Sequence, residues 1–478
     1  MPRHPLILLL ATLLVLPSCS LISVNARQSR AVNVSRQSND ALTGTGNVAM
    51  STLRATTIAA LHRPIYAAKL GLILIWERPT ELIRSNLPPG VVFGAAIPEV
   101  PGTPAFEARL DAEGFLRPAP GKLDLLIDGK RFFPEFERLV RTASTSVDVQ
   151  VYIFDNDDIG VRYADLLKAR SFEVPVRVLF DDIGTTMGAA VSPATPAPPG
   201  FAPPEDMLAY LPGHSKIRVR RILNPWLVSD HTKLIVIDHR TALLGGMNIG
   251  REYFSEWHDL MVRVEGPVVV RLQREFERNW RKAGPWGGFS DLDPRVRVKI
   301  PEGPGIPIRV LKTDPAMLRH DILRATRMAI RAARSRVWIE TPYFASDEIA
   351  REAEAAARRG VDVRVVIPSR GDSNIMDLSN LATARSLIES GAKVFRYPGM
   401  THAKVTLCDG WATLGSANLD ILSLRINREL NIAFSDPTVI RQLESEFFAP
   451  DFQKSRTLTL KETDIALGPI AESIADQL

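Results

Sequence analysis

The chain contains two copies of one short motif, HTKLIVID at residues 231–238 and HAKVTLCD at residues 402–409. Each copy has the form His-x-Lys-x-x-x-x-Asp and is followed by a glycine-containing turn and an asparagine. A single string of this kind recurs easily by chance, but two copies with matching tails are a specific signal. The pattern predicts two related halves that form one active site between them.

The repeat extends beyond the motifs and indicates a duplicated domain. The offset in sequence from His231 to His402 is nearly the same as the offset from Asn248 to Asn418. The offset between the strands expected at Val147 and Val337 is larger, because a proline-rich loop at residues 193–204 occurs only in the first half. Self-similarity at a nearly constant offset is typical of repeated structural units.

Around the motifs, apolar runs of strand length alternate with segments of helical periodicity. In the first half, strands are expected at residues 123–127, 147–154, 176–180, 217–222 and 234–237, and helices at 133–142 and 161–169. In the second half, strands are expected at residues 308–311, 337–344, 363–367 and 394–397, and helices at 322–333, 348–358 and 378–390. This alternation predicts an α/β fold with βαβ units and a sheet rich in parallel pairs.

Length and composition agree with a globular protein of more than one domain. The 478 residues are 45% hydrophobic and 24% charged, and a chain of this length exceeds one ordinary core. We place a tether and linker at residues 19–121, the two domains at 122–300 and 301–455, and a tail at 456–478. Within the linker, Leu70 to Trp76 is an apolar helical stretch too short to cross a bilayer, and residues 87–121, rich in Pro and Gly, are expected to be extended.

Residues 1–18 are typical of an export signal, with Arg3 ahead of an apolar run. The position of Cys19 resembles a bacterial lipoprotein signal, in which this cysteine is lipidated. Pro17 departs from that pattern, so a simple cleaved signal or an uncleaved anchor is the alternative. We expect a protein of the bacterial cell envelope, anchored by an N-terminal lipid, with its catalytic domains periplasmic or otherwise extracytoplasmic. The second cysteine, Cys408, lies in an apolar run and is expected to be a buried strand residue.

The residue types of the two motifs suit chemistry at a phosphodiester. On a strand, residues two apart share a face, so His231 should point the same way as Lys233, and His402 the same way as Lys404. Imidazole supplies a nucleophile or a proton near neutral pH. The lysines, with the amides of Asn248 and Asn418, would stabilise charge on the phosphate oxygens. This chemistry needs no cofactor or metal, and the sequence shows no carboxylate cluster suited to Mg²⁺ or Ca²⁺.

Two carboxylates recur at matching positions. Asp259 and Glu429 each follow the asparagine of their own half at the same spacing. A carboxylate bonded to the far imidazole nitrogen would fix the tautomer of a motif histidine and raise its basicity. His258, which precedes Asp259, is interpreted as a strand-edge histidine, with a catalytic role as the alternative.

The motif pair, together with VDVQVYIF at residues 147–154, ETPYF at 340–344 and GSANLDILSLRINRELN at 415–431, resembles the phospholipase D superfamily and is closest to bacterial cardiolipin synthases. The resemblance covers about residues 120–450. It implies two similar phospholipase D-like αβ-sandwich domains in a pseudo-twofold pair with one shared active site. One departure is a shorter connection between the motif and the glycine turn in the second half, which we interpret as a shortened turn.

The resemblance also implies a mechanism and the roles of residues. His231 would form a phosphohistidine intermediate, while His402 would protonate the leaving alcohol and then activate the acceptor. Lys233, Lys404, Asn248 and Asn418 would bind phosphate. Within the motifs, Asp238 and Asp409 would support the structure rather than take part in the chemistry.

The implied reaction is transfer of a phosphatidyl group to phosphatidylglycerol, which makes cardiolipin. The donor is a second phosphatidylglycerol or phosphatidylethanolamine, and the sequence does not decide between them. A hydrolase releasing phosphatidic acid is the first alternative, and a phosphodiesterase or nuclease of the same superfamily is the second. The net charge of +5 permits attraction to an anionic membrane surface, which is the expected partner; nucleic acid is not expected, and the oligomeric state is left open.

Overall fold

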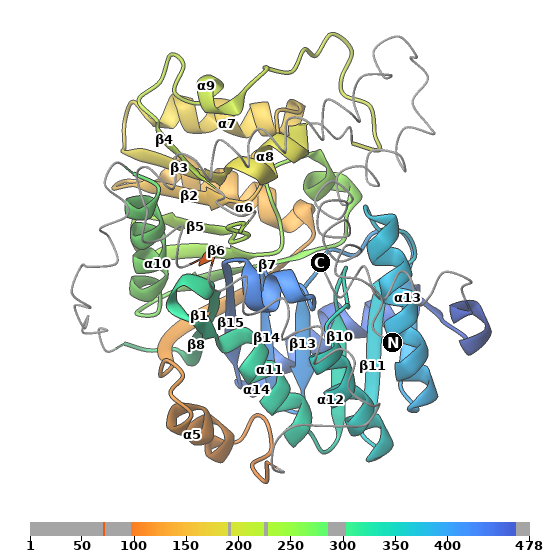
Figure 1. The fold of residues 1–478 in the computed structure, drawn as a ribbon. Helices are drawn as coiled ribbons and strands as arrows, with labels where there is room; N and C mark the ends of the chain where they lie inside the picture. Colours follow the sequence, from red (N-terminus) through yellow and green to blue (C-terminus); the bar gives the residue numbers. More distant parts are fainter. Residues whose placement is uncertain (1–69, 72–96, 190–192, 224–227, 285–302, 465–478) are drawn as a thin grey trace.

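The computed structural model describes residues 70–71, 97–189, 193–223, 228–284 and 303–464 (Figure 1). The predicted signal, Cys19, the tether and nearly all of the apolar stretch from Leu70 to Trp76 lie outside the described residues. Within the described ranges, no helix has both the length and the apolar character needed to span a bilayer.

The elements of the first half follow one another in a regular order. After helix α5 (Pro104–Ala112), its strands are β1 (Ala119–Ile127), β2 (Val147–Val151), β3 (Val176–Asp181), β4 (Arg218–Ile222), β5 (Leu234–Ile237), β6 (Thr241–Gly245) and β7 (Leu260–Glu265). Its helices are α6 (Gly129–Thr142), α7 (Asp158–Arg170), α8 (Asp182–Ala189), α9 (Met207–Tyr210), the π-helical η3 (Glu252–Glu256) and α10 (Val269–Lys282).

The second half repeats this order. Its strands are β8 (Ile306–Asp314), β9 (Arg319–His320), β10 (Arg336–Glu340), β11 (Asp362–Pro368), β12 (Lys393–Tyr397), β13 (Val405–Cys408), β14 (Trp411–Gly415), β15 (Glu429–Phe434) and β16 (Arg456–Thr457). Its helices are η5 (Pro315–Met317), α11 (Asp321–Ala332), α12 (Asp347–Arg358), α13 (Asn374–Glu389), η6 (Leu422–Ile426), α14 (Pro437–Gln442), η7 (Leu443–Phe448), α15 (Ala449–Lys454) and η8 (Leu460–Thr463).

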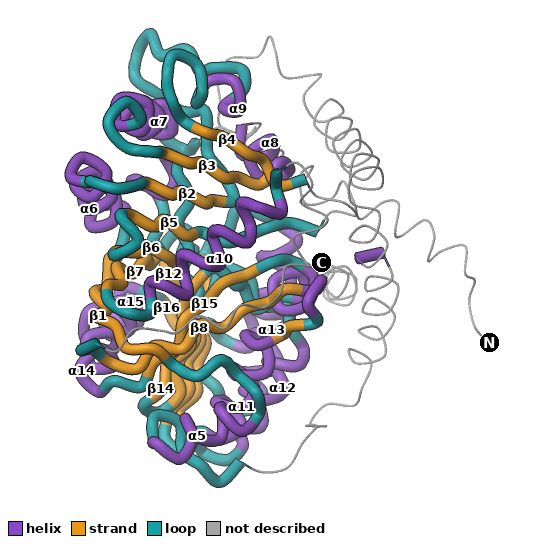
Figure 2. The backbone as a smooth tube through the Cα atoms, turned by 90° about the vertical axis from the view of Figure 1, so that its left-hand side faces the viewer, coloured by secondary structure: helices purple, strands orange, loops and turns teal. Residues whose placement is uncertain are grey.

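One continuous sheet runs through both halves (Figure 2). From one end the order is β4-β3-β2-β5-β6-β7-β1, and from the other, after β16, it is β12-β11-β10-β13-β14-β15-β8. The two orders correspond strand for strand, and they meet where β1 pairs antiparallel with β8. The halves are therefore two similar αβ domains related by a pseudo-twofold axis at this seam, as predicted.

The expectation of a parallel-rich sheet is wrong in detail. Among the described strands, parallel pairing is confined to β2-β3-β4 and β10-β11-β12, whereas β5-β6-β7 and β13-β14-β15 are antiparallel meanders. The reason is the short connections that follow the motifs, because a parallel pair needs a crossover of a dozen or more residues. The turn between β5 and β6 has three residues and that between β13 and β14 has two, which confirms the shortened turn in the second half.

Helices cover both faces of the sheet, and one core spans both halves. On the face covered by α10, α14 and η7, a single apolar cluster joins residues of the two domains, including Val264 and Phe276 with Leu414 and Phe447. The helices on the opposite face enclose a separate core in each half. Cys408, the last residue of β13, is buried in one of these cores, as expected for a strand cysteine.

The prediction of an extended linker at residues 87–121 is wrong for its described part. Helix α5 begins there, because Pro104 suits the first turn and the Thr103 side chain accepts a hydrogen bond from the N–H of Phe106. Phe106 is fully buried in the core of the second half. Arg309 of β8 donates hydrogen bonds to Glu107 and Asp111, at 2.7 and 2.9 Å, which fixes the helix to the seam.

Candidate active site

Both motif histidines and lysines lie just before a strand, rather than on it as the sequence predicted. Residues 231–233 precede β5 and residues 402–404 precede β13. Each lysine turns back and donates from Nζ to the carbonyl of its own histidine, at 2.8 Å for Lys233 and 2.6 Å for Lys404. Each ammonium group is therefore placed by the backbone of its own motif.

Each motif is attached to the opposite half of the molecule by a short parallel bridge. His231 donates from its backbone N–H to the carbonyl of Arg428 at 2.9 Å, next to a bridge between Asp230 and Arg428. In the other half of the site, His402 donates to the carbonyl of His258 at 2.7 Å, and His258 is bridged to Thr401. The site thus forms only where the two domains meet.

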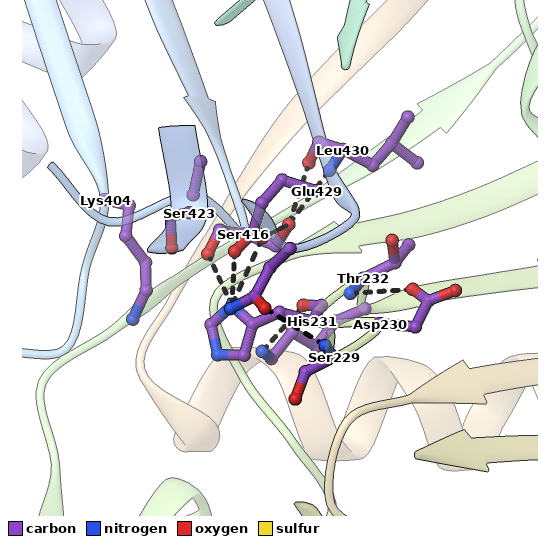
Figure 3. A network of polar contacts seen from close by, with 12 residues as sticks. Ser229, Asp230, His231, Thr232, Lys404, Ser416, Ser423, Glu429 and Leu430 are labelled. Carbon is purple, nitrogen blue, oxygen red and sulfur yellow. Dashed lines mark hydrogen bonds and ion pairs between the residues drawn. The ribbon is translucent and has the colours of Figure 1, made fainter. Parts of the chain in front are cut away.

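The two orienting carboxylates are exchanged between the halves. Nδ1 of His231 lies 3.0 and 3.1 Å from the carboxylate oxygens of Glu429, which belongs to the second half (Figure 3). Nδ1 of His402 lies 2.7 Å from Oδ2 of Asp259, which belongs to the first half. The spacing in sequence had indicated both carboxylates but not this exchange. Because each carboxylate accepts from Nδ1–H, Nε2 of each imidazole carries the lone pair.

Burial sets the protonation of the site. Burial and the positive charge of Lys233 and Lys404 hold the pKa of both motif histidines well below the usual imidazole value. Burial lowers the pKa of Lys404 to about 8 and raises the pKa of Asp259 and Glu429 to about 7. Burial also lowers the pKa of Lys233. Without substrate the two motif imidazoles are therefore neutral, and a bound phosphate anion would favour the charged forms of the lysines and histidines.

The motif aspartates lie at the far ends of β5 and β13, away from the histidines. The carboxylate of Asp238 accepts hydrogen bonds from the backbone N–H groups of residues 144–146, and that of Asp409 accepts from residues 334–336. Both residues have a positive φ, 54° and 49°, in the turns that follow the motif strands. They tie each turn to the start of the neighbouring strand, and the structure gives them no contact with the reactive groups.

The two asparagines are buried and already hold neighbouring groups. The Asn248 amide oxygen accepts from the N–H of Ile153 at 3.0 Å, and its Nδ2 donates to the Tyr253 hydroxyl at 2.8 Å. Asn418 makes a side-chain hydrogen bond to Asp420. An amide nitrogen has two hydrogens, so each asparagine retains one donor after these contacts.

Three aromatic rings beside the histidines were missed by the sequence analysis. The ring of Tyr152 meets that of His231 edge-on at 4.8 Å, and Nζ of Lys233 lies 5.1 Å above the same tyrosine. Tyr253 and Trp257 lie 5.4 and 5.2 Å from the ring of His402. For Tyr253 and Trp257 the available signal was EYFSEW after the first asparagine, because the second half has LSLRIN at this place and no aromatic residue.

The sequence showed no carboxylate cluster suited to Mg²⁺ or Ca²⁺, but the fold brings acidic side chains together in two places. The described residues bring together Asp155, Asp157 and Glu252 in one place, and His258, Glu340 and Asp451 in another. Members of both clusters already bind protein groups: Asp157 accepts from the N–H of Gly160, and Asp451 contacts His258. Residues distant in sequence form these clusters, so spacing alone did not reveal them.

Two αβ domains that share paired His-Lys motifs across one sheet define a phospholipase D-like enzyme. A sequence profile described as "Cardiolipin synthase, PLD-like domain" matches residues 137–280 and 327–449. Cardiolipin synthase A of Pseudomonas syringae pv. syringae is 33% identical over 366 residues, which cover 72% of this chain and 71% of that protein. The probable cardiolipin synthase YwiE of Bacillus subtilis is 29% identical over 359 residues, or 70% of this chain and 67% of that protein.

A solved structure shows the same fold. The crystal structure of phosphatidylserine synthase from Haemophilus influenzae Rd KW20 superposes with a TM-score of 0.60 at 15% identity, over 78% of this chain and 96% of that one. The chain belongs to the cardiolipin synthase, phospholipase D-like domain family. It is a phosphatidyltransferase of the phospholipase D superfamily.

Gly246 lies against Asp259 and leaves no room for a side chain. A Cβ atom there would lie 2.2 Å from Oδ1 of Asp259. We expect Gly246→Ala to displace this carboxylate from His402 and to lower the rate of phosphatidyl transfer about a hundredfold, as misplacement of a reactive group by about 1 Å does. The rate is measured with saturating lipid, alongside the unfolding temperature.

The matched control for Gly246→Ala is Ser416→Ala at the corresponding position of the second half. Ser416 donates from Oγ to Glu429, and its loss leaves room rather than a clash. We expect a smaller decrease in rate from this control. Equal activity of Gly246→Ala and the unmodified protein would show that the position of Asp259 does not limit the reaction.

Proposed function

We propose that this protein is a cardiolipin synthase that transfers a phosphatidyl group to phosphatidylglycerol through a phosphohistidine intermediate. The observation that carries the proposal is the pair of crossed contacts, His231 with Glu429 and His402 with Asp259, around two buried lysines. The sequence matches to cardiolipin synthases support the lipid substrate. A nuclease is the weaker alternative, because the matched cardiolipin synthases are lipid enzymes.

In the first step, Nε2 of His231 attacks phosphorus of the donor phosphodiester. A P–N bond forms as the P–O bond to the leaving alcohol breaks. Glu429 holds Nδ1–H of the attacking ring and stabilises the positive charge that develops on it. His402 donates a proton to the leaving oxygen, and Lys233 and Lys404 stabilise charge on the nonbridging oxygens.

His402 must carry a proton to act in this step, although burial lowers its pKa before substrate binds. The bound phosphodiester supplies that change, because a nearby anion favours the charged form of imidazole. Substrate binding thus prepares the acid, with Asp259 stabilising the imidazolium through Nδ1–H.

In the second step, His402 takes the proton from a hydroxyl of phosphatidylglycerol. The acceptor oxygen attacks phosphorus, the P–N bond breaks, and His231 returns to its neutral form. Water in place of the acceptor would yield phosphatidic acid. We propose that the rings of Tyr253 and Trp257, 5.4 and 5.2 Å from the ring of His402, favour transfer by limiting the access of water to this base.

Purified protein given labelled phosphatidylglycerol, with and without phosphatidylethanolamine, tests the reaction, and DNA is offered separately. We expect cardiolipin from the unmodified protein, and a loss of about 10²- to 10⁴-fold in His402→Ala, as for removal of a general acid and base. Comparison of the two lipid mixtures identifies the donor. Phosphatidic acid without cardiolipin would establish hydrolysis instead, and cleavage of DNA as the main activity would exclude both lipid functions.

The order of the two histidines is tested by trapping the intermediate. With phospholipid carrying labelled phosphorus and a rapid quench at alkaline pH, we expect label on His231, identified by peptide mass spectrometry. His231→Ala should carry none, and His402→Ala should accumulate label if its release is slowed more than its formation. Label found on His402 in the unmodified protein would reverse the two roles.

We propose that residues 1–19 export the chain and attach it by lipid to the cell envelope, with its catalytic domains extracytoplasmic. The support is the sequence pattern from Arg3 to Cys19, and a lipid substrate makes a membrane location useful. We expect incorporation of labelled palmitate into the full chain in bacterial cells and none in Cys19→Ser. Equal labelling of both proteins, or no labelling of either, would contradict attachment at this cysteine.

A further inference from the structure

The residue just before each orienting carboxylate carries the bridge between the halves. Arg428 precedes Glu429, and its guanidinium lies 2.9 Å from Oδ2 of Asp230, with both side chains buried. Arg428 also donates to the amide oxygen of Asn279, while Gln150 donates to Asp230 at 3.1 Å. The His231 half of the site is thus held by a permanent cation, Arg428, together with the carboxylate of Asp230 and the amides of Asn279 and Gln150.

His258 takes the corresponding place before Asp259. Its Nδ1 lies 2.6 Å from Oδ1 of Asp128, and its Nε2 lies 3.0 Å from Oδ2 of Asp451. Its side chain is 4% exposed, so water does not replace either partner. A ring that donates to a carboxylate from each nitrogen must carry both protons, and is therefore an imidazolium.

Two of the groups around Arg428 are the amides of Gln150 and Asn279, whereas their counterparts around His258 are carboxylates. Glu340 of β10 lies 3.8 Å from Nε2 and accepts a hydrogen bond from Thr401. Glu340 takes the place that Gln150 has in the first half, and Asp451 of α15 takes that of Asn279 on α10. The His402 half of the site is thus held by a titratable cation among carboxylates.

Other groups complete the environment of this ring. Lys454 lies 3.5 Å from Oδ1 of Asp451, and Lys130 lies 3.5 Å from Oδ2 of Asp128. Tyr397 of β12 and Phe447 of η7 stack on the imidazole at 4.8 and 5.2 Å. Burial lowers the pKa of His258, but the hydrogen bonds to Asp128 and Asp451 outweigh it and raise the pKa to about 10.

The link from His258 to the reactive groups is direct. Its carbonyl accepts from the N–H of His402 at 2.7 Å, and its N–H donates to the carbonyl of Met400 at 3.1 Å. The next residue, Asp259, orients His402. A shift of His258 would therefore move both members of the His402–Asp259 pair relative to His231.

We propose that His258 is a positioning residue: as an imidazolium between Asp128 and Asp451, it keeps Asp259 aligned with His402 and makes this half of the site the pH-sensitive one. The proposal rests on the proposed function of His402 for its effect on rate, but not for its effect on structure. The first half has Arg428 in this role, and its guanidinium does not lose its proton over the same pH range.

The direction of the pH effect follows from linkage. A histidine with a raised pKa contributes stability that is complete below the pKa of the unfolded chain, about 6.5, and is lost as the pH rises toward the folded value. For His258 this loss extends from about 6.5 to about 10. Glu340, whose pKa is raised to about 8 by burial and by Asp451, becomes charged within this range and gives the imidazolium a further partner.

The experiment compares His258→Arg and His258→Gln, with His214→Gln at an exposed histidine as the matched control. The unfolding temperature and the turnover of phosphatidylglycerol are measured from pH 6 to 10. We expect His258→Gln to lower kcat about ten- to a hundredfold at pH 7, with little change in KM. His258→Arg should retain more activity than His258→Gln, and its unfolding temperature should fall less than that of the unmodified protein between pH 7 and pH 10.

A second measurement does not depend on activity. With ¹⁵N-labelled histidine, both ring nitrogens of His258 should show the shifts of an imidazolium at pH 7.5, assigned by their loss in His258→Gln. A neutral ring, a rate unchanged in His258→Gln, or no difference between the arginine and glutamine variants would overturn the proposal. The proposal would also be overturned if the unmodified protein bound one equivalent of divalent metal tightly and His258→Gln did not, because an Nε2 that binds a metal cannot carry the second proton.

If the unmodified protein turns over no phospholipid, the proposed function fails, while the NMR and unfolding results still decide the state of His258.

Discussion

The exchange of carboxylates between the two halves is the contact on which this site depends. Glu429 holds His231, and Asp259 holds His402, so neither half contains both a motif histidine and the carboxylate that orients it. The seam between β1 and β8 and the apolar cluster shared across it keep these partners in place. Duplication of one domain thus produces a site that requires both copies. The short backbone bridges beside each motif join the two halves at this site.

Burial of charge at this seam explains both the chemistry and the structure around it. Two lysines and two carboxylates are removed from water within one site, and an unpaired charge there would be costly. Each ammonium group is held by a backbone carbonyl, and the carboxylates share protons with imidazoles whose pKa is depressed. A bound phosphodiester anion would favour the charged forms of the buried lysines, which a neutral molecule would not do.

The sequence predicted the repeat, the domain class and the residues that converge, because each depends on local pattern and spacing. The strands and helices that periodicity predicted are present, with β2 and β10 shorter than expected, but β6, β7, β14, β15 and α10 were not predicted. The sequence did not predict that Asp259 and Glu429 cross over, because spacing within a half contains no information on which half supplies the partner. Helix α5 was missed because Pro and Gly in its neighbourhood outweighed Phe106, whose burial depends on the distant second half.

The two halves have the same plan but differ at several positions around the motif histidines. The carboxylate that orients His402 is Asp259, which has a shorter side chain than Glu429 and lies beside Gly246. Glu429, which orients His231, also accepts a hydrogen bond from the hydroxyl of Ser416. Tyr253 of η3 and Trp257 just after it flank His402, but the corresponding η6 has no aromatic residue. These differences suit a division of labour, because a nucleophile needs one fixed orientation whereas a group that gives and then takes a proton needs an environment that responds to charge. A duplicated site would first have had two histidines in equivalent surroundings. Changes confined to the neighbouring residues are sufficient to give the two histidines different roles.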